Sequence, residues 1–143
     1  MQTDGRRAKE AAFSAVSRRP GARLFDVATG AYAALLVALT HYPRPEDLLG
    51  RKLPSDKLLH FMAYLLLGLL AAACVGYRRA WTWRAAAVIA AGLAVFAAID
   101  EATQPLFRRA AEPLDWVFDC LGIAVGIAIV AAVSSWASAR GSR

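Results

Sequence analysis

Four long apolar stretches, at residues 24–41, 57–76, 82–104 and 114–136, dominate this chain of 143 residues. Each is close to the about 20 residues that an α-helix needs to cross about 30 Å of hydrocarbon. The hydrophobic fraction of 58% also exceeds the about 45–50% of soluble domains. Only helices and closed barrels satisfy every backbone group in lipid, and stretches of this length do not fit barrel strands. The sequence therefore predicts an all-α, multi-pass integral membrane bundle of four transmembrane helices.

Basic residues in the connections indicate how the bundle is oriented. Lys and Arg are more numerous before the first stretch, between the second and third, and after the fourth than in the other two connections. By the positive-inside rule, both termini lie in the cytoplasm. We expect a basic cytoplasmic segment at 1–23 with a short interfacial helix at 9–16, a membrane domain at 24–136 and a cytoplasmic tail at 137–143. The sequence after the first stretch is a poor signal-peptide cleavage site, so this stretch is expected to be retained.

The net charge of +6 is explained by membrane topology rather than by nucleic acid, because no basic stripe with interleaved aromatics occurs. Membrane lipids are therefore the expected partners, and nucleic acid is not. Trp81, Trp83 and Trp136 suit an aromatic belt at the cytoplasmic interface. Cys74 and Cys120 fall near opposite faces of the membrane, so we expect no disulfide and interpret both as packing residues.

Polar residues gather where three of the stretches begin or end. They are Asp56, Lys57, His60 and Tyr64 in the second stretch, Asp100, Glu101 and Gln104 in the third, and Asp115 and Asp119 in the fourth. Because the stretches alternate in direction, all of these residues fall at one depth, under the outer leaflet. Charged residues inside a bilayer are costly and usually mark function. The sequence therefore predicts a polar binding site at this end of the bundle.

In the second stretch, Asp56, His60 and Tyr64 are spaced four residues apart and form one stripe on a helix, which Gly68 continues. Asp56 has a simpler interpretation, since either Ser55 or Asp56 can cap the helix N-terminus. His60 lies deeper than a cap. It is either a neutral imidazole hydrogen-bonded to another helix, or a general base, proton carrier or ligand.

In the third stretch, Asp100 and Gln104 share a helix face, whereas Glu101 points about 100° away from them. Carboxylates at a helix C-terminus meet an unfavourable dipole. They are either solvated among the headgroups or balanced by a positive partner. The candidate partners are Lys57, Arg108, Arg109, a metal ion or a substrate.

In the fourth stretch, Asp115, Asp119, Gly122 and Gly126 form a single stripe. Gly122 and Gly126 make a GxxxG pattern, which lets a neighbouring helix approach closely. The polar face is therefore expected to turn towards the bundle. Asp119 falls below the headgroups, where a carboxylate must be neutral or paired. Pro113 suits the first turn of this helix.

This constellation fits three uses: a network that ties the helices together, a carboxylate–histidine site for a divalent cation, or an acid–base pair that acts on a lipid headgroup. The candidate catalytic residues are His60, Asp100 and Glu101. The sequence has no nucleophile elbow, no HExxH and no phosphate-binding glycine loop. No motif requires a cofactor, and no metal site is predicted.

Four segments of the sequence, taken in order, form a pattern that is typical of a known family. They are Asp56-Lys57-Leu58-Leu59-His60-Phe61-Met62-Ala63-Tyr64 with Gly68, then Asp100-Glu101-Ala102-Thr103-Gln104, then Arg109, and then Asp115-Trp116-Val117-Phe118-Asp119-Cys120-Leu121-Gly122 with Gly126. In this order they resemble the VanZ-like family of small bacterial membrane proteins, over about residues 30–130. The family pattern usually has Asn where this chain has Asp119, so Asp119 must be protonated or paired if it serves the same purpose.

The resemblance implies a protein of the bacterial cell envelope, since the founding member of the family is linked to teicoplanin resistance; it implies no particular reaction. We predict a protein of the bacterial cytoplasmic (inner) membrane whose outer-face pocket binds a lipid or envelope-precursor headgroup. The alternatives are an enzyme that acts on a lipid-linked substrate through His60 and carboxylates, and a non-catalytic structural or partner protein. The expected centre of the site is His60, Tyr64, Asp100, Gln104, Asp115 and Asp119, with Arg109 as its cation and Glu101 outside the shared stripe.

Overall fold

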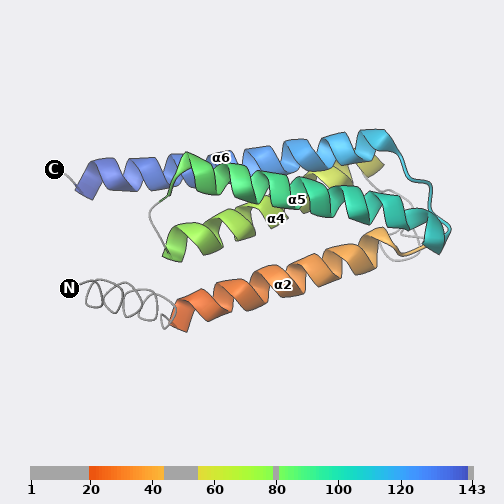
Figure 1. Ribbon diagram of the computed structural model, residues 1–143, viewed down its shortest axis with the longest axis horizontal. Coiled ribbons are helices and arrows are strands. Elements are labelled where there is room, and N and C mark those ends of the chain that lie inside the picture. Colours follow the sequence, from red (N-terminus) through yellow and green to blue (C-terminus); the bar gives the residue numbers. More distant parts are fainter. Residues whose placement is uncertain (1–19, 44–54, 79–80, 142–143) are drawn as a thin grey trace, which may run out of the picture.

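A computed structural model describes residues 20–43, 55–78 and 81–141. Within these ranges the chain is helical and contains no strand. The elements are α2 (Pro20–Thr40), α4 (Asp56–Arg78), α5 (Trp83–Thr103), the short 3₁₀ helix η1 (Gln104–Phe107) and α6 (Pro113–Gly141) (Figure 1). Four of these helical segments are long and apolar enough to cross a membrane. The prediction of an all-α protein with four membrane-length helices is confirmed.

The ends of the helices differ from the expected limits by about a turn. The first helix begins earlier, at Pro20, and ends at Thr40, so His41 lies in the following turn. The last helix continues to Gly141, beyond the expected limit at residue 136. The expected interfacial helix at 9–16 and most of the basic segment at 1–23 lie outside the described residues.

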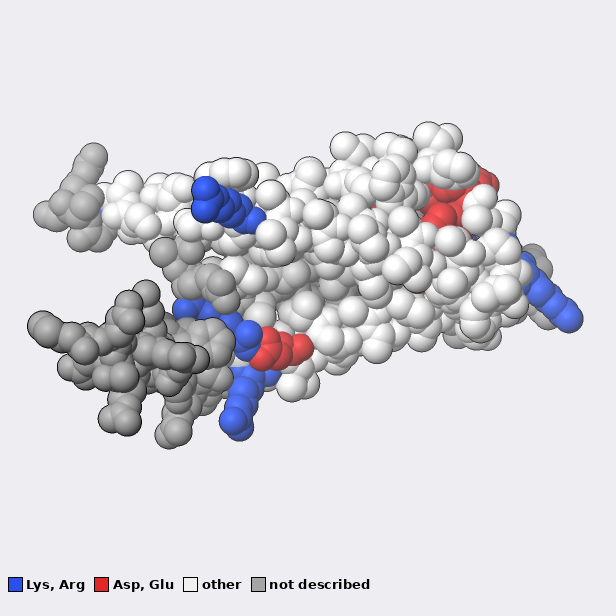
Figure 2. All heavy atoms as spheres, in the orientation of Figure 1, with Lys and Arg blue, Asp and Glu red and all other residues white. Residues whose placement is uncertain are grey.

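The four long helices run side by side in alternating directions, so the start of α2 and the end of α6 lie at the same end of the bundle (Figure 1). The opposite end, here called the polar end, collects the C-terminal ends of α2 and α5 and the N-terminal ends of α4 and α6. On the face in Figure 2, charged side chains lie towards the two ends, with a broad uncharged belt between them. This is the surface expected of a bundle that crosses a bilayer.

Helix α4 contacts each of the other three long helices, and its closest approach is to α6. Gly122 and Gly126 lie directly against the α4 backbone. A Cβ atom at Gly122 would lie 2.3 Å from the carbonyl oxygen of Phe61, and one at Gly126 would lie 2.5 Å from that of Leu65. On the α4 side, a Cβ at Gly68 would lie 2.9 Å from the Ile123 carbonyl oxygen. Glycine is therefore required on both sides for the two backbones to touch.

The end opposite the polar end has its own small ion pair. Arg78 donates hydrogen bonds to a carboxylate oxygen of Asp26 and to the Ala22 carbonyl oxygen. The Cys74 thiol also donates to Asp26, with Sγ 3.1 Å from Oδ1. Cys74 is thus a hydrogen-bond donor as well as a packing residue. Both described cysteines are free thiols.

Candidate functional site

Among the described residues, seven polar or charged side chains are buried, and all of them lie at the polar end. They are His41, His60, Asp100, Glu101, Gln104, Asp115 and Asp119. Polar groups taken out of water are costly unless they find partners. Their hydrogen bonds therefore determine how the site is built.

The centre of the site is a contact between α4 and α6. His60 Nδ1 lies 3.0 Å from Asp119 Oδ1, and both side chains are almost completely buried. The glycine contacts hold the two helices together next to this pair, since Phe61 and Gly122 touch through their backbones. The second oxygen of Asp119, Oδ2, is buried and has no hydrogen-bond partner among the described residues. The contact with Asp119 uses Nδ1 of the His60 ring.

A second group forms around Asp100 of α5. The Tyr64 hydroxyl donates to Asp100 Oδ2 at 3.1 Å, and the Thr40 hydroxyl donates to Oδ1 at 3.0 Å. His41 Nδ1 lies 3.5 Å from the same Oδ1, and His41 Nε2 lies 2.9 Å from the Thr103 hydroxyl. Sequence reasoning missed Thr40 and His41, although their place at the end of the first apolar stretch puts them at the same depth as the other polar residues.

Glu101 is buried within the same cluster. The Gln104 amide donates to Glu101 Oε2 at 2.8 Å, and the backbone N–H of Glu112 donates to Oε1 at 2.5 Å. Glu101 was expected outside the stripe of Asp100 and Gln104, and the structure buries it in the cluster all the same. Asp100 does point away from Glu101, towards α2 and Tyr64, but α5 is covered on both sides, so both carboxylates are enclosed. The sequence analysis did not predict Glu112, whose backbone N–H is a donor to Glu101.

The cations sit at the rim of the cluster. Lys57 Nζ lies 2.9 Å from Glu112 Oε2 and 3.6 Å from Asp115 Oδ1. The hydrogen bond from the Lys57 ammonium lowers the pKa of the exposed Glu112 carboxyl below its usual value. No lysine or arginine among the described residues contacts Asp100 or Glu101. The protein partners of these two carboxylates are instead neutral donors and His41.

Arg109 was the expected cation for the buried carboxylates, but it pairs with a different, exposed carboxylate. Its guanidinium lies 3.4 Å from Asp56, the exposed first residue of α4. The cap of this helix is Ser55, whose hydroxyl accepts from the Leu58 N–H at 3.4 Å. Arg108 is exposed and adopts a left-handed backbone conformation, with φ of 62°, where the chain turns after η1. Arg109 and Asp56 therefore belong to the mouth of the site.

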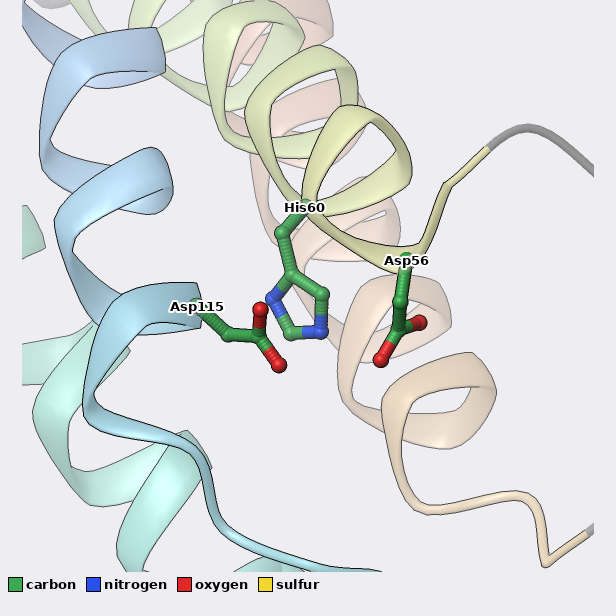
Figure 3. A group of neighbouring side chains, drawn as sticks. All are labelled: Asp56, His60 and Asp115. Carbon is green, nitrogen blue, oxygen red and sulfur yellow. The ribbon is translucent and has the colours of Figure 1, made fainter.

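Two groups of side chains at the polar end have the composition of a metal-ion site. His60, Glu101 and Asp119 can each offer a ligand atom within 4.8 Å of the others, as can Asp56, His60 and Asp115. In Figure 3 the His60 ring lies between the carboxylates of Asp56 and Asp115, which extend towards it from α4 and α6. Since both groups use His60, only one of them can bind an ion through this ring at a time.

A cavity of about 150 Å³ opens beside His60, between α2 and α4. Its walls are apolar and its polar end is formed by Thr40, Asp56, His60 and Arg109. The apolar lining residues are Tyr32, Leu36, Leu39, Leu59 and Ala63. A larger hollow of about 540 Å³ lies between α2 and α5 and is mainly apolar. The smaller cavity is the one that reaches both His60 and a cation.

These features define an all-helical, multi-pass membrane protein with a carboxylate–histidine cluster buried at one end. The chain matches the VanZ/LLP1 family over residues 23–134, and it belongs to that family. The match covers α4 and α5 completely, most of α2 and α6, and the whole cluster, and it confirms the resemblance found in the sequence. No curated protein and no solved structure matches the chain.

Proposed function

We propose that the protein is a cell-envelope protein whose polar end binds the headgroup of a membrane lipid or of a lipid-linked envelope precursor. The observation that carries this proposal is the cavity between α2 and α4. It combines an apolar wall, suited to a hydrocarbon chain, with Asp56, His60 and Arg109 at one end. Ligand sites in proteins typically have this composition, with a few polar groups that fix orientation within apolar walls.

The charges at the cavity indicate the chemistry of the headgroup. The Arg109 side chain is largely enclosed and its partner Asp56 is exposed and 3.4 Å away, which is a long contact. A phosphate group offers Arg109 a stronger, bidentate partner. The surrounding carboxylates need hydrogen-bond donors, which hydroxyl or ammonium groups supply. A phosphate-containing headgroup that also carries hydroxyl or ammonium groups fits both requirements.

The side of the membrane follows from the distribution of basic residues. The positive-inside rule assigns the polar end to the outer face of the bacterial cytoplasmic membrane. Lipid-linked precursors of the cell wall are exposed at this face. Binding of such a headgroup would affect how an envelope-directed glycopeptide such as teicoplanin acts, and tolerance to that antibiotic is the proposed cellular role.

The test compares two neighbouring arginines. The purified full chain is tested for binding to a polyprenyl-phosphate-linked saccharide and to phosphatidylethanolamine in detergent micelles. Hydrogen bonds to charged groups contribute about 1.5–3 kcal/mol, so Arg109→Gln should weaken binding about tenfold or more. Arg108→Gln removes the same charge from an exposed position outside the cavity and should change it little. Equal affinities for both variants, or the absence of binding by the wild type, would refute the proposal.

The same variants extend the test to cells. Cells that produce the wild-type chain should tolerate more teicoplanin than cells that produce Arg109→Gln at an equal level in the membrane. Arg108→Gln is the matched control. If all three strains are equally susceptible, the proposed link to glycopeptide tolerance is wrong, even if lipid binding is found.

An enzyme that acts on a lipid-linked substrate is the second candidate function, and the His60–Asp119 pair favours it. A carboxylate bonded to one nitrogen orients an imidazole and increases its basicity, and the other nitrogen can then take a proton from a nucleophile. The measurement that separates the two functions is release of phosphate or of the saccharide from the same probe. Binding without turnover supports the binding protein.

A further inference from the structure

The polar end encloses more negative charge than its protein partners balance. Four carboxylates, Asp100, Glu101, Asp115 and Asp119, are almost completely buried there. Among the described residues, Lys57 is the only lysine or arginine that contacts any of them, at 3.6 Å from Asp115, and it lies closer to Glu112. An ionised carboxylate in an apolar interior costs several kcal/mol unless it is paired. A positive charge is therefore expected within the cluster.

Protons alone do not complete the hydrogen bonding of these groups. Asp119 Oδ2 and Asp115 Oδ1 are buried and accept no hydrogen bond among the described residues, and the two aspartates are only 1% and 2% exposed. A proton on Asp119 Oδ2 would turn an unpartnered acceptor into an unpartnered donor. A metal ion, in contrast, accepts electron pairs directly from such oxygens. Asp115 Oδ1 already faces the Lys57 ammonium at 3.6 Å, so the oxygen that points to a further cation is Asp119 Oδ2.

We propose that His60, Glu101 and Asp119 form a buried binding site for a first-row divalent transition metal ion. The three side chains come from α4, α5 and α6, and their ligand atoms lie within 4.8 Å of one another. Bonds of about 2.0–2.2 Å place two ligands of one ion at most about 4.4 Å apart, so small side-chain rotations close the site. One imidazole with two carboxylates suits Zn²⁺ or Mn²⁺ better than Ca²⁺ or Mg²⁺, which take oxygen ligands.

The inner group is favoured over the alternative group of Asp56, His60 and Asp115. Asp56 is exposed and already pairs with Arg109, whereas Glu101 and Asp119 are enclosed and face no arginine or lysine among the described residues. The three inner ligands leave coordination positions free for water or for an oxygen of a bound molecule. The metal site shares His60 with the headgroup cavity but uses neither Arg109 nor the apolar cavity walls, so metal binding and headgroup binding are tested separately.

The test uses Zn²⁺ as the probe. The purified full chain is stripped with EDTA and titrated with Zn²⁺ by calorimetry, and its metal content and thermal unfolding are measured after desalting. The wild type should bind one ion per chain and unfold at a higher temperature when loaded. Glu101→Gln and Asp119→Asn preserve side-chain size but remove a ligand charge. Mutation of a residue in the outer shell of a metal site typically weakens binding about 10–100-fold. Loss of a direct ligand should weaken Zn²⁺ binding by at least as much in each of these two variants.

Two controls make the assignment specific. Asp56→Asn removes the carboxylate of the outer group, and Asp26→Asn removes one at the opposite end of the bundle; both should retain the wild-type affinity within about twofold. The site is refuted if the wild type shows no saturable binding, if Glu101→Gln binds as well as the wild type, or if Asp56→Asn loses as much affinity as Glu101→Gln. Folding of each variant is checked by size-exclusion chromatography. If Asp119→Asn does not fold, Glu101→Gln decides the outcome.

Discussion

The contact between α4 and α6 gives the most quantitative prediction, the effect of Gly122→Ala on stability. The added Cβ would lie 2.3 Å from the Phe61 carbonyl oxygen and 2.8 Å from the Leu65 nitrogen. Ordinary C···O contacts are about 3.3–3.6 Å, so the helices must separate by about 1 Å. Both atoms belong to the backbone, so no side-chain rotation relieves the overlap. Overpacking of this kind costs about 1–3 kcal/mol, and the rigid neighbours place Gly122→Ala towards the upper end.

The matched control is Gly92→Ala in the middle of α5, where a Cβ would meet nothing within 4 Å. Alanine in place of glycine favours a helix by about 0.8–1.0 kcal/mol, and this gain applies to both variants. The difference between the two variants therefore isolates the overpacking cost of about 1–3 kcal/mol. The assay is reversible unfolding of the full chain in mixed micelles, followed by circular dichroism. Equal stability of the two variants would refute the close backbone contact.

Two further predictions concern the polar end. Tyr64→Phe removes a buried donor to Asp100, and since hydrogen bonds to charged groups contribute about 1.5–3 kcal/mol, it should lower the free energy of unfolding by an amount in that range; an unchanged free energy would contradict this contact. Lys57→Gln should raise the pKa of Glu112 towards its usual value, as measured by NMR titration of that carboxyl. Because the pKa of Glu112 is lowered in the folded protein, the stability that the pair contributes is present above the unfolded pKa and is lost as the pH falls through the folded one. Acidification should therefore weaken the wild type more than Lys57→Gln, and equal acid sensitivity would show that the pair contributes nothing.

The helices and their polar ends were accessible from the sequence because hydrophobic length and helical spacing are local properties. The four stretches became four helices, and the stripe of Asp119, Gly122 and Gly126 lies on the face of α6 that meets α4. Helical spacing also placed His60 and Tyr64 on one face, and the two reach Asp119 and Asp100 on different helices. Helical spacing therefore predicted which face of each helix is polar, but not which neighbouring helix that face contacts.

The remaining features depend on how each helix is rotated against its neighbours, which local spacing does not determine. Glu101 was set apart because it points about 100° from Asp100, yet α5 lies where both directions meet protein. His41 follows the end of α2 and was treated only as the limit of a span, although it contacts Asp100 at 3.5 Å. The cation was assigned to Arg109, but the chain path after η1 brings Arg109 to Asp56 at the mouth.

The directions of the helices determine whether the helix dipole stabilises or destabilises each carboxylate at the polar end. Asp56, Asp115 and Asp119 lie in the first two turns of α4 and α6, where the positive end of the helix dipole stabilises negative charge. Asp100 and Glu101 lie in the last turn of α5, where the dipole is unfavourable. Asp100 offsets this with two hydroxyl donors and His41, whereas Glu101 has an amide and a backbone N–H. Glu101 therefore has fewer partners than Asp100 to offset the dipole, and its ligand atom lies within 4.8 Å of one of Asp119. A cation bound between Glu101 and Asp119 would offset the unfavourable helix dipole at the end of α5.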